Sequence, residues 1–339
     1  MRNEHAVYVQ TNDANGNRVI AFARAADGTL SPSGDYATGG AGDGVAHLTS
    51  QGSVVLTGDG GHLLVTNAGS DSLSVFAVTS DGLELVQAVP TGEAPKSVAE
   101  RDRLVYVLNT GVPSVTGFRL EENGLVPLAD SSRELGSDAD PAQLGFSPDG
   151  STLVVTDRGT DSIVLYPVDA EGFLGEPRRY GSSGPTPYGF AFTSQGTLVV
   201  TEAFGAQTGK AAASSYTVSG PSVAPVSRSV GNGRSEICWA VVTNDDRYAF
   251  TTNFADGAVS RYAIAPDGSI SLEDAAAGVA VDGQSGLRDE GLTGDGRFLY
   301  AIDADSQRIF GWEVGANGML SPLGSWDGLP VTVAGLAAS

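Results

Sequence analysis

Short stretches of alternating apolar and polar residues recur along the whole chain, and a turn signal follows each of them. In residues 72–77, for example, Leu73, Val75 and Ala77 occupy every second position. A period of two residues is typical of β-strands, and no segment shows the 3.6-residue spacing of an amphipathic helix. The pattern therefore predicts an all-β fold.

Glycine turns divide the chain into repeats. In seven places a glycine follows a residue of the kind that begins tight hairpin turns, and these glycines are 42 to 54 residues apart. Such turns favour glycine because it adopts positive φ without strain. A period of about 48 residues falls in the range of β-propeller blades. The seven glycines are Gly28, Gly82, Gly124, Gly172, Gly220, Gly268 and Gly318.

A second marker, a carboxylate or carboxamide side chain, ends the predicted second strand of each repeat. Seven repeats of this length fill all 339 residues and leave no room for another domain. We therefore expect a single seven-bladed propeller with four antiparallel strands in each blade. The markers are Asn12, Asn67, Asn109, Asp157, Glu202, Asn253 and Asp303.

The first repeat lacks an innermost strand, and residues 330–334 near the C-terminus form a strand without a repeat of its own. Adding this strand to the N-terminal three would complete one blade and leave no long exposed edge. We expect blades at 331–339 plus 5–36, 50–90, 92–130, 138–180, 185–228, 235–274 and 285–325.

Strand direction places one group of side chains together. In antiparallel blades, the turn after the second strand and the connection between blades lie on one face, and the glycine turns lie on the other. The markers and the residues that open each inner strand should therefore surround one mouth of the axial channel. Three long connections, 37–52, 203–213 and 275–287, fall on this face, and long loops often carry function.

Charge and composition exclude several functions. The formal net charge is −21, from 19 Lys and Arg against 40 Asp and Glu, so binding to nucleic acid or to anionic membrane surfaces is not expected. No apolar run is long enough to span a bilayer, and the first ten residues do not resemble a signal peptide, so we expect a cytoplasmic protein. One cysteine and three histidines argue against disulfides and a zinc site.

Two strings, Phe146-Ser147-Pro148-Asp149-Gly150 and residues 65–70 (Val-Thr-Asn-Ala-Gly-Ser), resemble the lactonase-type seven-bladed propellers. That family includes 6-phosphogluconolactonase and carboxymuconate lactonizing enzymes. The resemblance implies an acid–base site with histidines before the first string, an arginine and a histidine opening the next inner strand, and a glutamate ending that blade's second strand. Glu202 matches the glutamate, whereas Gln143 and Tyr188 stand where the family has basic residues.

The predicted site combines these positions. Glu202 is the candidate general acid or base, with Tyr188 as a donor to a developing oxyanion and His47 as a further catalytic group. For Glu202 the alternative is a turn cap, and Arg288 and Glu290 could form an internal ion pair instead of binding a ligand. We expect a Glu202→Gln variant to lose turnover with little change in thermal stability. The candidate substrate-binding residues are Gln143, Arg288, Glu290, Trp239, Phe204, Lys96 and Arg158.

Two classes of function are compatible with these residues. The first is a lactonase-like enzyme that hydrolyses, closes or isomerises a small polar or cyclic metabolite at the mouth. The second is a propeller that binds a ligand or a protein partner at the same face without catalysis. No cofactor is expected; a divalent cation held by the Asn and Asp markers is the less favoured alternative, because turn caps give the same pattern. The sequence does not specify an oligomeric state.

Overall fold

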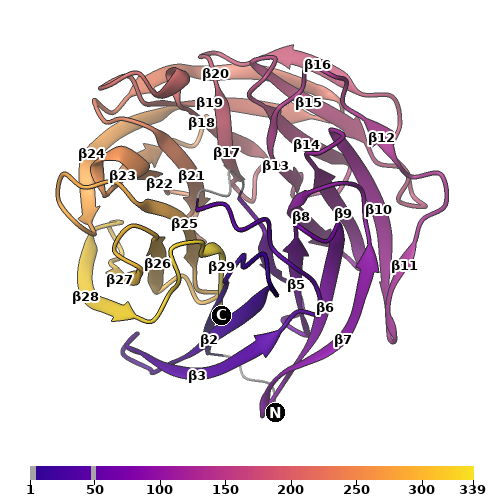
Figure 1. Ribbon diagram of the computed structural model, residues 1–339. Helices are drawn as coiled ribbons and strands as arrows, with labels where there is room; N and C mark the ends of the chain where they lie inside the picture. The colour runs from indigo at the N-terminus through magenta and orange to yellow at the C-terminus, as the bar shows by residue number, and fades with distance from the viewer. Residues whose placement is uncertain (1–4, 47–50) are drawn as a thin grey trace.

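The computed structural model describes residues 5–46 and 51–339 and confirms the propeller. Seven β-sheets stand around a central axis like the blades of a fan (Figure 1). Each sheet has four antiparallel strands, and the third carries an additional short strand on its outer side. The two helical turns in the described residues are single 3-10 turns, η1 (Phe204–Ala206) and η2 (Phe254–Asp256).

The first four blades follow the chain, each running from the axis outwards. Blade 1 contains β29 (Ala334–Ala338), β1 (Ala6–Gln10), β2 (Arg18–Arg24) and β3 (Leu30–Ala37). Blade 2 contains β4 (Val54–Leu56), β5 (His62–Asn67), β6 (Ser72–Thr79) and β7 (Gly82–Pro90). Blade 3 contains β8 (Pro95–Arg101), β9 (Leu104–Asn109), β10 (Ser114–Glu121), β11 (Gly124–Pro127) and the short β12 (Arg133–Glu134). Blade 4 contains β13 (Pro141–Phe146), β14 (Thr152–Asp157), β15 (Ser162–Pro167) and β16 (Arg178–Gly181).

The last three blades have the same order. Blade 5 contains β17 (Pro187–Phe192), β18 (Thr197–Glu202), β19 (Ala212–Ser219) and β20 (Ser222–Gly231). Blade 6 contains β21 (Ile237–Val242), β22 (Tyr248–Asn253), β23 (Ala258–Ile264) and β24 (Ile270–Val279). Blade 7 contains β25 (Leu287–Leu292), β26 (Phe298–Asp303), β27 (Arg308–Val314) and β28 (Leu320–Asp327).

The two ends of the chain close the ring, although the closing strand lies farther along than the sequence predicts. The inner strand of blade 1 is β29, four residues beyond the predicted segment, and it pairs antiparallel with β1. The pairing shifts register between Val9 and Gln10, and Gly335 in β29 has a φ of +64°. The strand begins later because residues 330–333 form a turn, in which the Val333 N–H donates to the Pro330 C=O at 3.1 Å.

Apolar side chains pack between neighbouring blades, and this packing forms the core. Tyr106 and Leu108 of blade 3, for example, cluster with Leu144 and Val155 of blade 4. All seven predicted turn glycines have positive φ, so the turn signals that defined the repeats are confirmed. Each blade therefore packs against a neighbour on both of its faces, and this packing holds the inner strands around the axis.

Candidate functional site

The marker residues at the ends of the second strands hold the connections between blades. Asn109 accepts a hydrogen bond from the backbone N–H of Gly92 at 3.1 Å, and Asp157 accepts one from Asp140 at 2.8 Å. Both side chains are fully buried. In each case the donor lies in the segment that leads into the inner strand of the same blade. The markers therefore fix where each inner strand begins.

Glu202 occupies the same position in blade 5 and is completely buried. Its Oε1 accepts hydrogen bonds from the backbone N–H of Gly184 at 2.8 Å and from the Ser214 hydroxyl at 2.6 Å, with a longer one from Ser182 at 3.3 Å. Its Oε2 accepts one from Ser229 at 2.7 Å. The carboxylate is thus enclosed within its own blade by donors, and a ligand at the mouth does not reach it in this structure.

Aromatic and basic side chains converge where the inner strands of blades 5, 6 and 7 begin. The rings of Tyr188 and Trp239 lie 4.7 Å apart. The guanidinium of Arg158 lies 4.8 Å from the centre of the Tyr188 ring, and that of Arg288 lies 5.3 Å from the centre of the Phe254 ring. We call Arg158, Tyr188, Cys238, Phe254 and Arg288 the mouth cluster.

Burial keeps the Tyr188 hydroxyl and the Cys238 thiol of the mouth cluster protonated. Burial raises the pKa of the Tyr188 hydroxyl well above its usual value, although Arg158 and Arg288 act in the opposite direction. Burial likewise raises the pKa of the Cys238 thiol to about 12, so this cysteine is protonated at neutral pH and is a poor nucleophile. Among residues 5–46 and 51–339, Tyr188 accepts a hydrogen bond from Thr156 with its backbone oxygen, and no hydrogen bond involves its hydroxyl, which can therefore donate one to a ligand.

The other predicted site residues that the structure describes make contacts outside the mouth cluster. Gln143 binds the backbone N–H and C=O of Phe190, so its amide joins blade 4 to blade 5. Lys96 pairs with Asp43 at 3.6 Å. Phe204, in η1, lies against Gly184 rather than beside Tyr188 and Trp239. His47 lies outside the described residues.

Arg288 and Glu290 do not form the ion pair that was the alternative to ligand binding. Within residues 5–46 and 51–339, no ion pair joins the two side chains. The pairing of β25 with β26 shifts register between Leu287 and Glu290, so simple alternation along this strand does not apply. Glu290 is buried, neither of its carboxyl oxygens has a hydrogen-bond partner among the described residues, and burial raises its pKa well above the usual value.

Gln51 is a residue of the axial channel that the sequence pattern did not reveal. Its side-chain amide donates to the backbone C=O of Ala240 at 2.9 Å and accepts from the backbone N–H of Ala240 at 3.2 Å. These bonds connect blade 2 to blade 6, which are not neighbours in the ring. Gln51 therefore bridges the channel. Only the long preceding loop, 37–52, hinted at this role, because a single glutamine carries no spacing signal.

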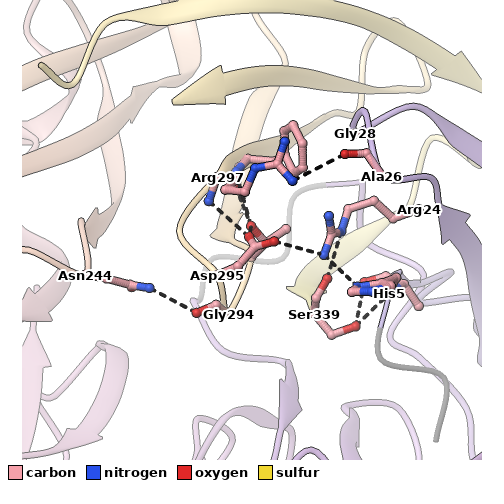
Figure 2. Close-up of polar contacts among 12 residues, drawn as sticks. His5, Arg24, Ala26, Gly28, Asn244, Gly294, Asp295, Arg297 and Ser339 are labelled. Carbon is pink, nitrogen blue, oxygen red and sulfur yellow. Dashed lines mark hydrogen bonds and ion pairs between the residues drawn. The ribbon is translucent and has the colours of Figure 1, made fainter. Parts of the chain in front are cut away.

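The opposite face holds a second buried cation, shown in Figure 2. The Arg24 guanidinium donates to the backbone oxygen of Ser339 at 2.9 Å and contacts Nδ1 of His5 at 2.9 Å. It also lies 3.5 Å from the Asp295 carboxylate and over the Phe298 ring. Arg24 thus ties β2 to both ends of the chain and to blade 7.

Neither a metal-binding cluster nor a membrane-spanning helix occurs among the described residues. No three His, Cys, Asp or Glu side chains in residues 5–46 and 51–339 come close enough together to hold a metal ion. None of the helices in the part of the chain that the structure describes is long and apolar enough to cross a bilayer.

The family assignment follows from the sequence match. The profile of the family described as lactonase, 7-bladed beta-propeller matches residues 2–137 and 126–203, which together cover more than half of the chain. The chain belongs to this lactonase family. A curated relative, the uncharacterized protein YwcC of Lactococcus lactis, is 32% identical over 126 residues, which are 34% of this chain and 37% of that protein. The alignment thus spans little more than a third of the relative.

Solved structures support the fold of this lactonase-family propeller. A candidate 6-phosphogluconolactonase from Bacteroides fragilis superposes with a TM-score of 0.75 at 16% identity, covering 98% of both chains. The periplasmic gluconolactonase PpgL of Pseudomonas aeruginosa superposes with a TM-score of 0.74 at 17% identity, also covering 98% of both. At these identities the likeness shows the fold alone.

Proposed function

We propose that this lactonase-family propeller hydrolyses a small cyclic ester at the mouth cluster. The observation that carries the proposal is the Tyr188 hydroxyl, which stays protonated, makes no hydrogen bond among the described residues, and lies near two guanidinium groups. A protonated donor beside fixed positive charge is what a developing oxyanion requires. The substrate classes of the two solved relatives, phosphogluconolactone and gluconolactone as their names state, are consistent with such a site.

The proposed reaction is addition of water to the ester carbonyl. The carbonyl oxygen gains negative charge as the water oxygen bonds to carbon, and Tyr188 donates a hydrogen bond to it. Arg158, held 2.6 Å from Asp140, and Arg288 stabilise the same charge electrostatically. The ring C–O bond then breaks, and the leaving alkoxide takes up the proton that the water loses. Glu202 is assigned to this site as a positioning residue, because it anchors the segment that leads into Tyr188.

The test is turnover by the purified chain of a panel of sugar-acid lactones and unsaturated dicarboxylates, with and without a chelator. The dicarboxylates report ring closure or isomerisation, which the same site could support. We expect Tyr188→Phe to lower kcat on the best lactone about 100-fold with little change in KM. Tyr166→Phe is the matched control, because the Tyr166 hydroxyl is buried between blades 3 and 4 and has no hydrogen-bond partner in the part of the chain that the structure describes. Equal activity of Tyr188→Phe and wild type would exclude Tyr188 as the oxyanion donor.

A second function, ligand binding without catalysis, is favoured by the enclosure of Glu202. A carboxylate that already accepts several hydrogen bonds is a poor proton acceptor for chemistry at the mouth. Saturable binding of lactones with no turnover of any compound in the panel would support this function over hydrolysis.

A further inference from the structure

The inner strands of blades 5 and 6 begin with β-bulges, and two residues of the mouth cluster lie in them. The register of β17 against β18 shifts just before Phe190, and that of β21 against β22 shifts just before Ala240. Tyr188 and Cys238 fall within these shifts. A bulge releases residues from the regular strand ladder and re-aims their side chains, so other contacts must fix where Tyr188 points.

A glutamine side chain binds the backbone directly after each of these bulges. Gln143 of blade 4 accepts a hydrogen bond from the N–H of Phe190 at 2.6 Å and donates one to its C=O at 3.1 Å. Gln51 makes the same pair of bonds with Ala240, at 3.2 Å and 2.9 Å. Each carboxamide thus pairs with the free edge of an inner strand as a neighbouring strand would.

The two glutamines reach the equivalent backbone positions from different places. Gln143 is the third residue of its inner strand, β13, and binds the inner strand of the next blade. By the same arrangement, Ala240 in blade 6 would be bound by the third residue of β17, which is Gly189. A Cβ atom at Gly189 would lie 2.6 Å from the carbonyl oxygen of Cys238 and 2.8 Å from Cα of Trp239. The two inner strands are therefore too close together for a side chain at this position.

Gln51 supplies this contact from across the ring. A Cβ atom at Gly189 would also lie 2.8 Å from Oε1 of Gln51, so the Gln51 amide occupies the space beside the glycine. Blade 3 holds the backbone of Gln51, because the Ser97 hydroxyl donates to its C=O at 2.5 Å. This anchored side chain binds the residue that follows Trp239, whose ring lies 4.7 Å from the ring of Tyr188.

We propose that Gln51 is a positioning residue for Tyr188: it holds the bulge of blade 6 from across the channel and, through Trp239, fixes the Tyr188 ring. The inference rests on the proposed function for what this positioning serves, and it adds a residue of blade 2 to a site built by other blades. A displacement of about 1 Å at a reacting group can lower a rate about 100-fold. Loss of the two hydrogen bonds therefore affects turnover more than stability.

Tryptophan NMR signals test the proposal without requiring turnover. The chain has three tryptophans, so its indole N–H groups give three signals in a ¹H–¹⁵N correlation spectrum, and the signal lost in Trp239→Phe belongs to Trp239. Gln51→Met keeps the length of the side chain and removes both hydrogen bonds. We expect it to shift the Trp239 signal by more than its line width and to leave those of Trp312 and Trp326, both in blade 7, in place. An unchanged Trp239 signal would overturn the proposal.

Turnover separates positioning from a purely structural role. On the lactone that the wild type hydrolyses best, we expect Gln51→Met to lower kcat about tenfold and to change KM by less than about twofold. In a Tyr188→Phe background the same substitution should have no further effect, because the hydroxyl that it misplaces is absent. A tenfold loss in both backgrounds, or full activity of Gln51→Met, would contradict the assignment.

Gln87→Met is the matched control. The Gln87 carboxamide also joins two blades, because it accepts a hydrogen bond from the backbone N–H of Leu125 at 2.9 Å, but it lies on the outer strands of blades 2 and 3. We expect this variant to keep the wild-type Trp239 signal and kcat. The same shift in Gln87→Met as in Gln51→Met would contradict the proposal, because the loss of any contact between blades would then produce it.

A second variant keeps the test open if Gln51→Met does not fold. Gln51→Asn has an amide that is one methylene too short to reach Ala240 from a backbone held by Ser97, so we expect the same shift and the same loss of kcat. If the chain hydrolyses no lactone, the proposed function fails, and the Trp239 signal alone decides whether Gln51 fixes the mouth cluster.

Discussion

Two buried arginines lie on opposite faces of the propeller and differ in what surrounds them. Arg24, where the two ends of the chain meet, has an acceptor for each of its principal donors, whereas Arg288 at the mouth has none among the described residues. Two buried glutamates repeat the contrast. Glu202 accepts several hydrogen bonds within blade 5, and Glu290 in blade 7 accepts none from any residue that the structure describes. A buried ionisable group with partners holds the fold together, and one without partners either costs stability or, like Glu290, favours its neutral form.

The largest effect is expected at Glu202. Glu202→Gln replaces one of the two acceptor oxygens by an amide N–H₂ group, so either Ser229 must turn from donor to acceptor or Gly184 loses its acceptor, and the remaining hydrogen bonds lose their charge assistance in a buried site. We expect the free energy of unfolding to fall by about 3 kcal/mol, measured by urea denaturation. Glu84→Gln, on the exposed outer strand of blade 2, is the control.

This expectation replaces the one from the sequence, which foresaw little change in stability. A Glu202→Gln protein as stable as wild type but without turnover would restore Glu202 as a catalytic acid or base at the mouth.

Arg24→Met should have the next largest effect. The variant removes the hydrogen bond to Ser339 and the contact with Asp295, which leaves the half-buried Ser339 carbonyl beside the closing strand without this donor. We expect a loss of about 2 kcal/mol, together with faster hydrogen exchange in β29 and β1, because the closure is the element that Arg24 ties down. Unchanged exchange in these two strands would show that Arg24 contributes nothing specific to the closure.

Glu290→Gln is expected to stabilise the protein, in a pH-dependent way. Burial, with the nearby Asp289 charge as a smaller cause, raises the pKa of Glu290 above its unfolded value, so its carboxyl favours folding at low pH and opposes it as the pH rises. The stability of Glu290→Gln relative to wild type should grow by about 1 kcal/mol over the first pH unit above the ordinary glutamate value near 4.3, and by about 1.4 kcal/mol for each further unit until the folded carboxyl itself ionises. A difference independent of pH would mean that Glu290 is charged in the folded protein.

Gln51→Ala should have the smallest effect. It removes two hydrogen bonds across the channel to the backbone of Ala240, an inner-strand residue whose N–H and C=O can be satisfied by channel water instead. We expect a loss of about 1 kcal/mol. A loss as large as that of Glu202→Gln would show that the channel bridge, and not only the blades, holds the ring together.

The sequence was sufficient to predict the architecture, because the signals for it are local. Glycines such as Gly28 and Gly268 need positive φ at each hairpin, and their spacing sets the number of blades. The position of residues that open inner strands also identified Tyr188, Trp239 and Arg288 as neighbours of one mouth. Local sequence patterns thus predict which residues lie near the mouth, but not which side chains contact one another there.

The partners of each side chain could not be predicted, because they come from other blades and from breaks in the strand pattern. The enclosure of Glu202 depends on serines 12 and 27 residues away. Phe254 entered the mouth cluster instead of Phe204, although both follow a marker by one or two residues. Gln51 reaches a residue 189 positions distant. Whether a buried charge is satisfied is therefore a property of the assembled ring.

The contrast between the two arginines is tested most directly by measuring the unfolding free energies of Arg24→Met and Arg288→Met side by side, in a buffer free of phosphate and carboxylates. We predict opposite signs: Arg24→Met is less stable than wild type, and Arg288→Met is more stable, because it no longer buries a charge without an acceptor. A loss of stability in both variants would mean that Arg288 is a structural residue like Arg24, and not a positive charge kept for the oxyanion that develops at the mouth cluster.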